Sequence, residues 1–402
     1  MCRGLRLTPF LDLGFTAPAD QFLRKEQLGE PEISYPLEVV LCEGCGLFQL
    51  SHVVSPEILY RHDYPYEASI TRTGRLHWAE FARSTVERFQ LGAQDLVVDI
   101  GSNVGVLLDS FKTCGVKTLG VDPAGNIVRL AEKNGIETLC EFFSNDVARE
   151  IVRTKGHASV ITATNVFAHI DDLEDLMTAV KTLLKKGGIF IFEAPYVVNL
   201  ITSLQYDTIY HEHLSYLSVK PLKQFLAKFA LEVFDIHERD IHGGSFRVFV
   251  AEAGRQAISP EVAEFLEREE RMKLYDLKTL GTFAKAVEQN RQDLLWLLRS
   301  LKKEGKKIAA VSAPAKGMTL LNYCRIGTET LDFVTEKSTL KIGRFTPGTH
   351  LPVLPDEALA ERRIDVALLL AWNFAEEIMK NLESYRKNGG KFIIPIPSPK
   401  VV

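Results

Sequence analysis

The sequence predicts an α/β protein in which strands and helices alternate along most of the chain. Apolar runs typical of buried strands alternate with helical patterns from residue 76 to about residue 250, and a second such series begins at Lys307. The first 55 residues differ from both series and contain a closely spaced pair of cysteines. Alternating strands and helices form βαβ units, so we expect a parallel sheet in each of the two series.

Length and composition limit the classes of protein to consider. The 402 residues indicate two or three domains. Hydrophobic residues make up 46% and charged residues 25%, the net charge is -4, and there is no basic block typical of a nucleic-acid groove. No apolar run approaches the roughly 18 residues of a membrane span, the N-terminus has no secretory signal pattern, and six cysteines are too sparse for a disulfide scaffold. We therefore expect a cytoplasmic protein with neither a nucleic-acid nor a membrane partner.

Residues 1–55 are predicted to form a small zinc-ribbon-like module. Cys42 and Cys45 lie on a pattern typical of a knuckle turn between two short strands, where two thiolates can chelate one Zn²⁺. A structural zinc site takes four ligands, and Cys2 is the only cysteine upstream; Leu5 stands where its partner would fall. The missing ligand could precede the first residue, or His52 could serve. Bound zinc and a vestigial turn both remain open interpretations.

Residues 56–254 are predicted to form the central α/β domain. Apolar runs indicate its strands, and helical periodicity indicates the segments between them. The predicted strands are 95–101, 117–122, 137–140, 158–163 and 188–193, and the predicted helices are 76–91, 106–112, 126–134, 146–153 and 173–184.

Residues 255–402 are predicted to form a smaller C-terminal α/β domain. Ser259 followed by Pro260 and Glu261 is typical of a helix start, and the charged amphipathic stretch that follows predicts one helix or two in tandem. The other predicted elements are strands at 307–311, 330–334, 365–370 and 391–394 and a helix at 375–387.

The strongest local motif is the glycine loop after the first strand of the central domain. Gly101 and Gly105 have three residues between them, in place of the tighter G-x-G-x-x-G of dinucleotide sites. The longer loop suits a ligand without phosphates, S-adenosylmethionine (SAM), and Asp122 at the end of the next strand can accept both ribose hydroxyls. A Rossmann-like NAD site is the alternative. The predicted cofactor-binding residues are Asp99, Gly101, Asn103, Gly105, Asp122 and Asn165.

Candidate residues for the second substrate follow the later strands, where open α/β sheets bind ligands. Asn165 to His169 follow one predicted strand, and Tyr210-His211-Glu212-His213 comes after the next. One histidine could be a general base near neutral pH, with Glu212 orienting it or binding a hydroxyl. A metal site, for which ligands are few, and structural histidines are the alternatives.

Several blocks of residues occur in a specific order over nearly the whole chain. They are Phe10–Gly14 with Ala19-Asp20, Cys42–Leu50, Tyr64–Tyr66, the Asp99 glycine loop, Asn165–Ile170, Tyr210–His213, His242–Ser245, Ala315–Gly317, Thr346–His350 and Trp372–Glu376. In this order they resemble the SAM-dependent C-methyltransferases that act on nucleotide-linked keto-deoxysugars. The resemblance implies a zinc-binding N-terminal module, a Rossmann-like SAM methyltransferase domain, and a C-terminal Rossmann-like domain that supports the nucleotide-sugar.

The resemblance also implies roles for individual residues. His213 would remove the proton next to the sugar ketone, and the resulting enolate would attack the methyl group of SAM. The residues implied to line the sugar pocket are Tyr210, Glu212, His169 and Tyr64, and those implied near the nucleotide are Lys316 and His350. The family usually has two cysteine pairs, and this chain has Cys2 alone in place of the first, so Cys2, Cys42 and Cys45 are the metal ligands it offers.

Other functions remain to be weighed against this one. An O- or N-methyltransferase acting on another small acceptor could use the same His213 without any carbon acid. A non-catalytic protein with a vestigial SAM site is disfavoured by the intact loop acids and glycines, and an RNA methyltransferase by the charge. The expected assembly is a monomer or a small homo-oligomer.

Overall fold

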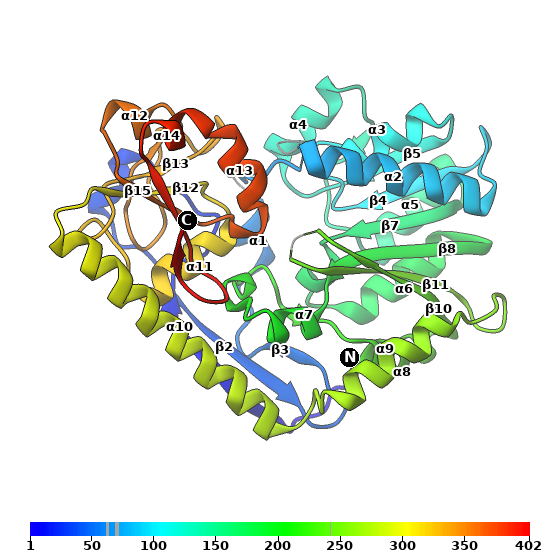
Figure 1. The fold of residues 1–402 in the computed structure, drawn as a ribbon. Coiled ribbons are helices and arrows are strands. Elements are labelled where there is room, and N and C mark those ends of the chain that lie inside the picture. Colours follow the sequence, from blue (N-terminus) through cyan, green and yellow to red (C-terminus); the bar gives the residue numbers. More distant parts are fainter. Residues whose placement is uncertain (62–63, 69–71, 242) are drawn as a thin grey trace.

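The structure is a computed structural model that describes residues 1–61, 64–68, 72–241 and 243–402. Within these ranges the chain forms a four-stranded, a seven-stranded and a six-stranded sheet. The two larger sheets and their helices make two lobes that stand side by side, and the N-terminal strands run below them in the view of Figure 1. One cluster of buried apolar side chains extends through all three sheets, from Leu11 to Ile396. The predicted α/β class is confirmed.

The N-terminal sheet is antiparallel and has the strand order β1-β2-β3-β9. In β1 (Leu7–Thr16), the buried Leu11 and Leu13 are separated by an exposed residue, as expected for a strand with one face on the core. The predicted knuckle turn joins β2 (Tyr35–Cys42) to β3 (Phe48–Leu50). The last strand, β9 (Ser215–Tyr216), comes from a distant part of the chain. Two short helices, η1 (Lys25–Gly29) and α1 (Pro56–Tyr60), complete this part.

The central sheet has the strand order β10-β11-β8-β7-β4-β5-β6. Its strands are β4 (Leu96–Ile100), β5 (Lys117–Val121), β6 (Thr138–Leu139), β7 (Ala158–Thr164), β8 (Leu184–Pro195), β10 (Leu231–Arg239) and β11 (Ser245–Glu252). Strands β4 to β8 pair in parallel, and β10 and β11 add an antiparallel edge. Every residue of β4 is buried, as its apolar run predicts, and the sheet extends from β4 in both directions. The carboxyl end of β4 is therefore the place where such sheets bind ligands.

Helices flank this sheet and connect its strands. They are α2 (Arg72–Phe89), α3 (Val106–Thr113), α4 (Gly125–Lys133), α5 (Asn145–Lys155), α6 (Leu173–Leu183), α7 (Val197–Thr202) and α8 (Val219–Ala227), with the short turns η2 (Phe167–His169) and η3 (Tyr206–Thr208). Among the described residues, no helix combines the length and apolarity needed to cross a membrane.

The C-terminal part begins with two helices, α9 (Pro260–Arg271) and α10 (Leu277–Lys303), so the tandem form of the prediction holds. Its sheet has the order β14-β13-β12-β15-β16-β17 and is parallel except for β17. The strands are β12 (Ile308–Val311), β13 (Val334–Thr335), β14 (Val353–Leu354), β15 (Val366–Leu369), β16 (Lys391–Ile394) and β17 (Lys400–Val401). The helices are α11 (Ala315–Cys324), α12 (Ala358–Glu361), α13 (Ala375–Asn381) and α14 (Glu383–Lys387), with the turn η4 (Trp372–Phe374).

Two C-terminal elements differ from the prediction. The strand expected at 330–334 is reduced to β13, because the backbone N–H groups of Thr330 and Leu331 bond to the Gly327 carbonyl in a turn. The helix expected at 375–387 is broken at Leu382, whose side chain is buried between α13 and α14.

Candidate active site

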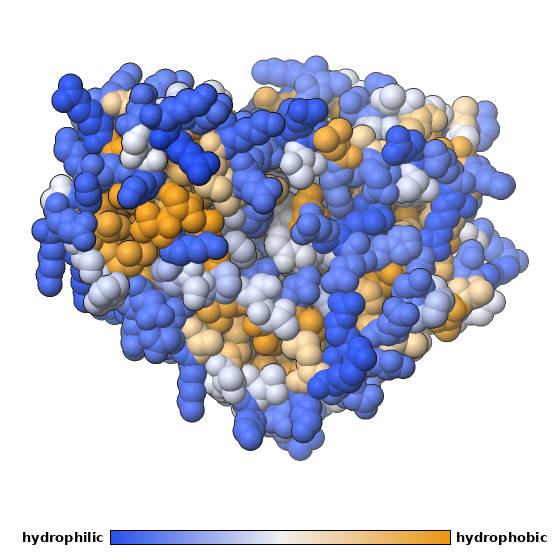
Figure 2. All heavy atoms as spheres, in the orientation of Figure 1, coloured by the Kyte–Doolittle hydropathy of each residue, from blue (hydrophilic) through white to orange (hydrophobic). Residues whose placement is uncertain are grey.

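A cavity of about 610 Å³ lies between the two lobes, where Figure 2 shows the surface hollowed. All three parts of the chain line it. The lining includes Asp20 from the N-terminal part, Asp99, Gly101, Asn103, Asp122, Asn165, His169, Tyr210 and His213 from the central part, and Lys316, Glu336, Lys337, Lys341 and Asn373 from the C-terminal part. The cavity therefore brings together the carboxyl end of β4, the predicted catalytic segment and the C-terminal lobe.

Asp122 presents an oriented carboxylate to the cavity. Its Oδ2 accepts the backbone N–H of Asn103 at 2.9 Å, and its Oδ1 accepts the backbone N–H of Ala124 at 2.9 Å. Burial raises the pKa of Asp122 above its ordinary value, against the effect of these two hydrogen bonds. Ser102 also lines the cavity, and its buried Oγ has no hydrogen-bond partner among the described residues. Oriented carboxylates and an unpaired hydroxyl suit a polar, cationic cofactor such as SAM.

Asp99 and the two loop glycines shape the floor of this end. Burial raises the pKa of Asp99 to about 7, although the Thr162 hydroxyl donates to its Oδ1 at 2.6 Å. Gly101 has φ +63° and lies so close to Val166 that no side chain fits there. Gly105 has φ +81°, does not line the cavity, and would bring a Cβ within 2.8 Å of Ile136. Gly105 thus packs the loop against its neighbour, while Gly101 lets the loop approach a ligand.

The amide of Asn103 holds a segment of chain beside the loop. Its Oδ1 accepts the backbone N–H of Ala68 at 2.9 Å, and its Nδ2 donates to the Tyr66 carbonyl at 3.0 Å. Asn126 Nδ2 donates to the Tyr64 carbonyl at 2.8 Å in the same way. Asn103 itself has φ +51°, a conformation that asparagine tolerates better than most residues. Asn103, predicted to bind cofactor, therefore holds Tyr66 and Ala68, and Asn126 holds the predicted sugar-pocket residue Tyr64.

Asn165 lies at the carboxyl end of β7 and lines the cavity. Its φ is +56°, and its backbone N–H donates to the Glu193 carbonyl at 2.7 Å. The cofactor loop of β4 and the acceptor segment after β7 therefore meet at one edge of the sheet.

The hydrogen bonds of His213 define its tautomer. Nδ1 lies 2.7 Å from the Thr208 carbonyl oxygen, which can only accept, so Nδ1 carries the proton. Nε2 then has a lone pair, and the Tyr210 hydroxyl donates to it at 2.8 Å. His213 and Tyr210 both line the cavity. A ring fixed through Nδ1, with Nε2 directed to the cavity-lining Tyr210, is the arrangement that a general base requires.

His169 lies beside His213, with ring centroids 4.9 Å apart. Burial, with the nearby His213, lowers the pKa of His169 well below its ordinary value, so this ring is neutral. The Tyr60 hydroxyl lies 3.1 Å from His169 Nδ1. The Tyr60 ring is stacked on the imidazole of His169. Tyr60 was missed by the sequence analysis, although it stands four residues before Tyr64 and both residues line the cavity.

Glu212 lies behind the cavity lining and is fully buried. Burial, together with the nearby charge of Asp20, raises the pKa of Glu212 to about 8, although the Asp20 backbone N–H bonds to its carboxyl group. Its Oε2 has no hydrogen-bond partner among the described residues. Glu212 is thus a buried carboxyl group, with its protonated form favoured by burial, that lies behind the Tyr210–His213 segment.

Lys316 lines the C-terminal wall of the cavity, at the start of α11. Its Nζ lies 3.7 Å from Asp207 Oδ2 and 4.1 Å from the centroid of the Trp372 ring. Burial lowers the pKa of Lys316, and the Asp207 carboxylate opposes this effect. His350 is placed differently: it does not line the cavity, and its Nε2 lies 2.8 Å from Glu32 Oε2.

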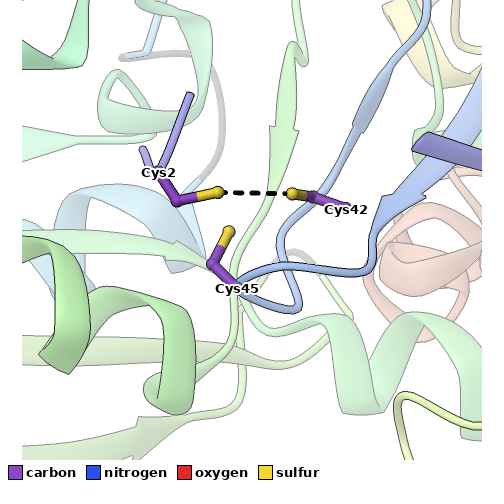
Figure 3. A group of neighbouring side chains, drawn as sticks. All are labelled: Cys2, Cys42 and Cys45. Carbon is purple, nitrogen blue, oxygen red and sulfur yellow. Dashed lines mark hydrogen bonds between the residues drawn. The ribbon is translucent and has the colours of Figure 1, made fainter. Parts of the chain in front are cut away.

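The three N-terminal cysteines come together at the knuckle turn (Figure 3). The Sγ atoms of Cys2, Cys42 and Cys45 all lie within 4.8 Å of one another, with 3.4 Å between Cys2 and Cys42. Burial and the neighbouring thiols raise the pKa of Cys45 to about 12. Three converging thiols fit three corners of a tetrahedral zinc site, and a metal ion would replace their protons.

His52 is not placed to complete the cysteine cluster. The prediction that it could be the fourth ligand is wrong, because its ring stacks on Tyr35 at the opposite end of β2 from Cys42. In the described ranges, the group of residues that could hold a metal contains the three cysteines alone. His242, in the block His242–Ser245, lies outside the described residues.

Comparison with known proteins identifies the family. A model described as "Putative zinc binding domain" matches residues 1–60, one described as "Methyltransferase domain" matches 75–236, and one described as "C-methyltransferase C-terminal domain" matches 240–397. "C-methyltransferase NovU" of Streptomyces niveus is 38% identical over 405 residues, which cover 100% of this chain and 96% of that protein. The chain belongs to this C-methyltransferase family. It is a SAM-dependent C-methyltransferase with a zinc-binding type of N-terminal domain, as the resemblance in the sequence implied.

Other matches are partial. "Ubiquinone biosynthesis O-methyltransferase" of Cupriavidus pinatubonensis is 30% identical over 94 residues, 23% of this chain and 38% of that protein. A solved S-adenosylmethionine-dependent methyltransferase from Clostridium acetobutylicum aligns with 45% of this chain and 92% of that chain, at 18% identity and a TM-score of 0.36. The full-length match supports transfer to carbon.

Proposed function

We propose that this enzyme methylates the carbon next to the ketone of a nucleotide-linked 4-keto-deoxysugar, with His213 as the general base. The observation that carries the proposal is the tautomer of His213, whose proton on Nδ1 is held by the Thr208 carbonyl while Nε2 faces the cavity-lining Tyr210. The carbon next to a ketone is acidic enough for a positioned imidazole to deprotonate, since the charge spreads into an enolate. An ordinary histidine titrates at about 6.5, close to the working pH.

The residues around His213 divide the work of the first step. Nε2 takes the proton from the substrate carbon, and the electron pair of that C–H bond becomes the enolate. The Tyr210 hydroxyl turns from Nε2 to the enolate oxygen and donates to it. Burial keeps His169 neutral, so His213 has no second positive charge beside it when it takes the proton. The buried walls of the cavity exclude water that would return the proton.

The residues at the other end of the cavity hold the cofactor. Asp122 would accept the ribose hydroxyls, and Asp99, Gly101, Asn103 and Asn165 would form the rest of the site. SAM bound there supplies an electrophilic methyl group on a sulfonium. The enolate carbon would take this methyl group as the carbon–sulfur bond breaks, and S-adenosylhomocysteine would remain. Because the loop after β4 and the segment after β7 meet at one sheet edge, donor and acceptor are held at close range.

The C-terminal part would hold the nucleotide, with Lys316 on the wall of the cavity. We place the boundaries of the three parts at 1–55, 56–254 and 255–402. The three cysteines would hold zinc as a structural ion at the edge of the N-terminal sheet, away from the chemistry.

The test is a panel of nucleotide-linked 4-keto-deoxysugars offered with methyl-labelled SAM. We expect label on carbon, and in D₂O we expect deuterium at the carbon next to the ketone even without SAM. His213→Asn should lower turnover by about 100-fold or more and abolish the exchange, while SAM affinity stays within about twofold. His157→Asn is the matched control, because His157 is exposed and does not line the cavity. Label on oxygen, or full exchange in the His213 variant, would refute the proposal.

A further inference from the structure

The lysines that line the cavity come from one part of the chain, whereas carboxylates line both of its ends. The lysines in its described lining are Lys316, Lys337 and Lys341, all from the C-terminal part. Carboxylates of the central part line the cavity, namely Asp99, Asp122, Asp171, Asp172 and Asp175, and Glu336, Asp356 and Glu377 line it on the C-terminal wall. An acidic end suits the sulfonium and amino groups of SAM, and a wall that carries lysines suits an anionic group of the other substrate.

Lys341 is the most deeply placed of these lysines. Its side chain is 5% exposed, whereas Lys337 is exposed and Lys316 half-buried. Its Nζ donates to the Ala313 carbonyl at 2.7 Å and to Asp20 Oδ1 at 3.3 Å, and lies 4.8 Å from the centroid of the Phe22 ring. Burying an ammonium is costly unless it is paired. An ammonium has three N–H groups, and these two hydrogen bonds leave one for a group in the cavity.

The position of Lys341 is the junction of the three parts of the chain. Ala313 follows β12 and precedes Lys316 on the C-terminal wall. Asp20 lines the cavity and bonds through its backbone N–H to Glu212, the neighbour of His213. Two backbone hydrogen bonds between Leu23 and Phe345, of 2.9 and 2.8 Å, fix the N-terminal loop to the segment that follows Lys341. The ammonium therefore lies between the catalytic segment and the wall assigned to the nucleotide.

A nucleotide-sugar has its charges in the same order. The sugar and the nucleoside are neutral, and the diphosphate between them carries the negative charge. If the sugar lies at His213 and the nucleoside against the C-terminal wall, the diphosphate falls at the junction. Two acids on that wall already have partners: Glu336 accepts the backbone N–H groups of Ala313 and Lys337, and Glu377 accepts the Thr73 hydroxyl.

We propose that Lys341 is the ammonium that binds the diphosphate of the sugar substrate, and that Asp20 holds it in position until the diphosphate arrives. This assignment rests on the proposed function. It makes Lys341 a binding residue and Asp20 a positioning residue for the same reaction. It also explains why an N-terminal loop contributes to the cavity. The carboxylate of Asp20 in this loop balances the charge of Lys341 before the substrate binds.

The experiment measures binding rather than turnover. Nucleoside diphosphates of the common bases and the matching nucleosides are titrated into the full chain by calorimetry, in the presence of S-adenosylhomocysteine. Lys341→Met should lose about tenfold or more in affinity for the preferred diphosphate and nothing for its nucleoside or for SAM. Lys306→Met is the matched control, because Lys306 pairs with Asp365 at 3.7 Å on the outer surface. Inorganic pyrophosphate, titrated alone, separates recognition of the diphosphate itself from recognition of the whole nucleotide.

A second variant, Asp20→Asn, should not weaken diphosphate binding as Lys341→Met does. Asp20→Asn removes the competing carboxylate but keeps an oxygen that can accept from Lys341, so affinity for the diphosphate should stay the same or rise. An ion pair with a structural role alone predicts losses in both variants. Unchanged diphosphate affinity in Lys341→Met, or an equal loss in Asp20→Asn, would overturn the inference. If the unaltered protein binds no nucleoside diphosphate and methylates no nucleotide-sugar, the proposed function fails instead.

Discussion

At the scale of single residues, the chemistry depends on one backbone carbonyl. The Thr208 oxygen accepts from His213 Nδ1 at 2.7 Å, and this contact leaves the lone pair on Nε2, which accepts from the Tyr210 hydroxyl. The resemblance implied that His213 is the base and that Tyr210 lines the sugar pocket, and both stand in one short motif. The sequence could not predict the tautomer, since the carbonyl that sets it belongs to a turn whose geometry appears only in the folded chain. Tyr60 and Lys341 were missed for the same reason, because their partners lie far away in sequence.

The Tyr210 hydroxyl should contribute to turnover through the enolate. Tyr210→Phe removes the donor that lies 2.8 Å from Nε2 but leaves the ring in place. We expect turnover to fall by about 100-fold, the usual effect of losing one such donor, with little change in SAM affinity. Steady-state kinetics with labelled SAM measure the change.

A control for this substitution is Tyr385→Phe. The Tyr385 hydroxyl donates to the Lys391 carbonyl in the C-terminal lobe and does not line the cavity. It should leave turnover within about twofold. Equal turnover in Tyr210→Phe and the original protein would mean that another group stabilises the enolate.

At the scale of elements, the sequence predicted best where one strand or helix is specified by its own residues. Each residue of β4 is buried, as the run Leu96–Ile100 predicts, and the glycine loop follows at once. Prediction was poorer where contacts in the folded chain determine the ends of an element, as in the short β13 and in the break at Leu382. The same holds for Asn103, whose amide holds Tyr66 and Ala68 through contacts that no periodicity shows.

The cofactor loop offers a test that separates backbone strain from crowding. Gly105 has φ +81° and would place a Cβ 2.8 Å from Ile136, whereas Gly115 has φ +82° with open space around it. Gly115→Ala should therefore lose only the cost of a left-handed backbone, about 1 kcal/mol of unfolding free energy. Gly105→Ala should lose about 1–3 kcal/mol more, because Ile136 must move. Chemical denaturation measures both, and equal losses would show that Ile136 yields without cost.

At the scale of the whole molecule, the three parts are tied together at the active site. The strand β9 begins two residues after His213, yet it pairs with β3 in the N-terminal sheet. Phe48 of β3 pairs with Tyr216 of β9, and the same sheet carries the cysteine turn. The order of the motifs predicted three parts, but a strand of two residues gives no sequence signal, so this connection emerged only from the structure. It links the metal module to the catalytic segment.

Loss of metal from the cysteine cluster should therefore reach the active site. Three thiols within 4.8 Å stabilise the knuckle turn best when a cation replaces their protons. We expect the purified protein to hold zinc, measured by atomic emission, and Cys45→Ser to hold much less. The variant should melt at a lower temperature and turn over more slowly, because β3 no longer holds β9 firmly. Cys114→Ser, at an exposed cysteine outside the cluster, should keep its zinc and its activity. If Cys45→Ser loses zinc and keeps full turnover, the sheet positions His213 without help from the metal.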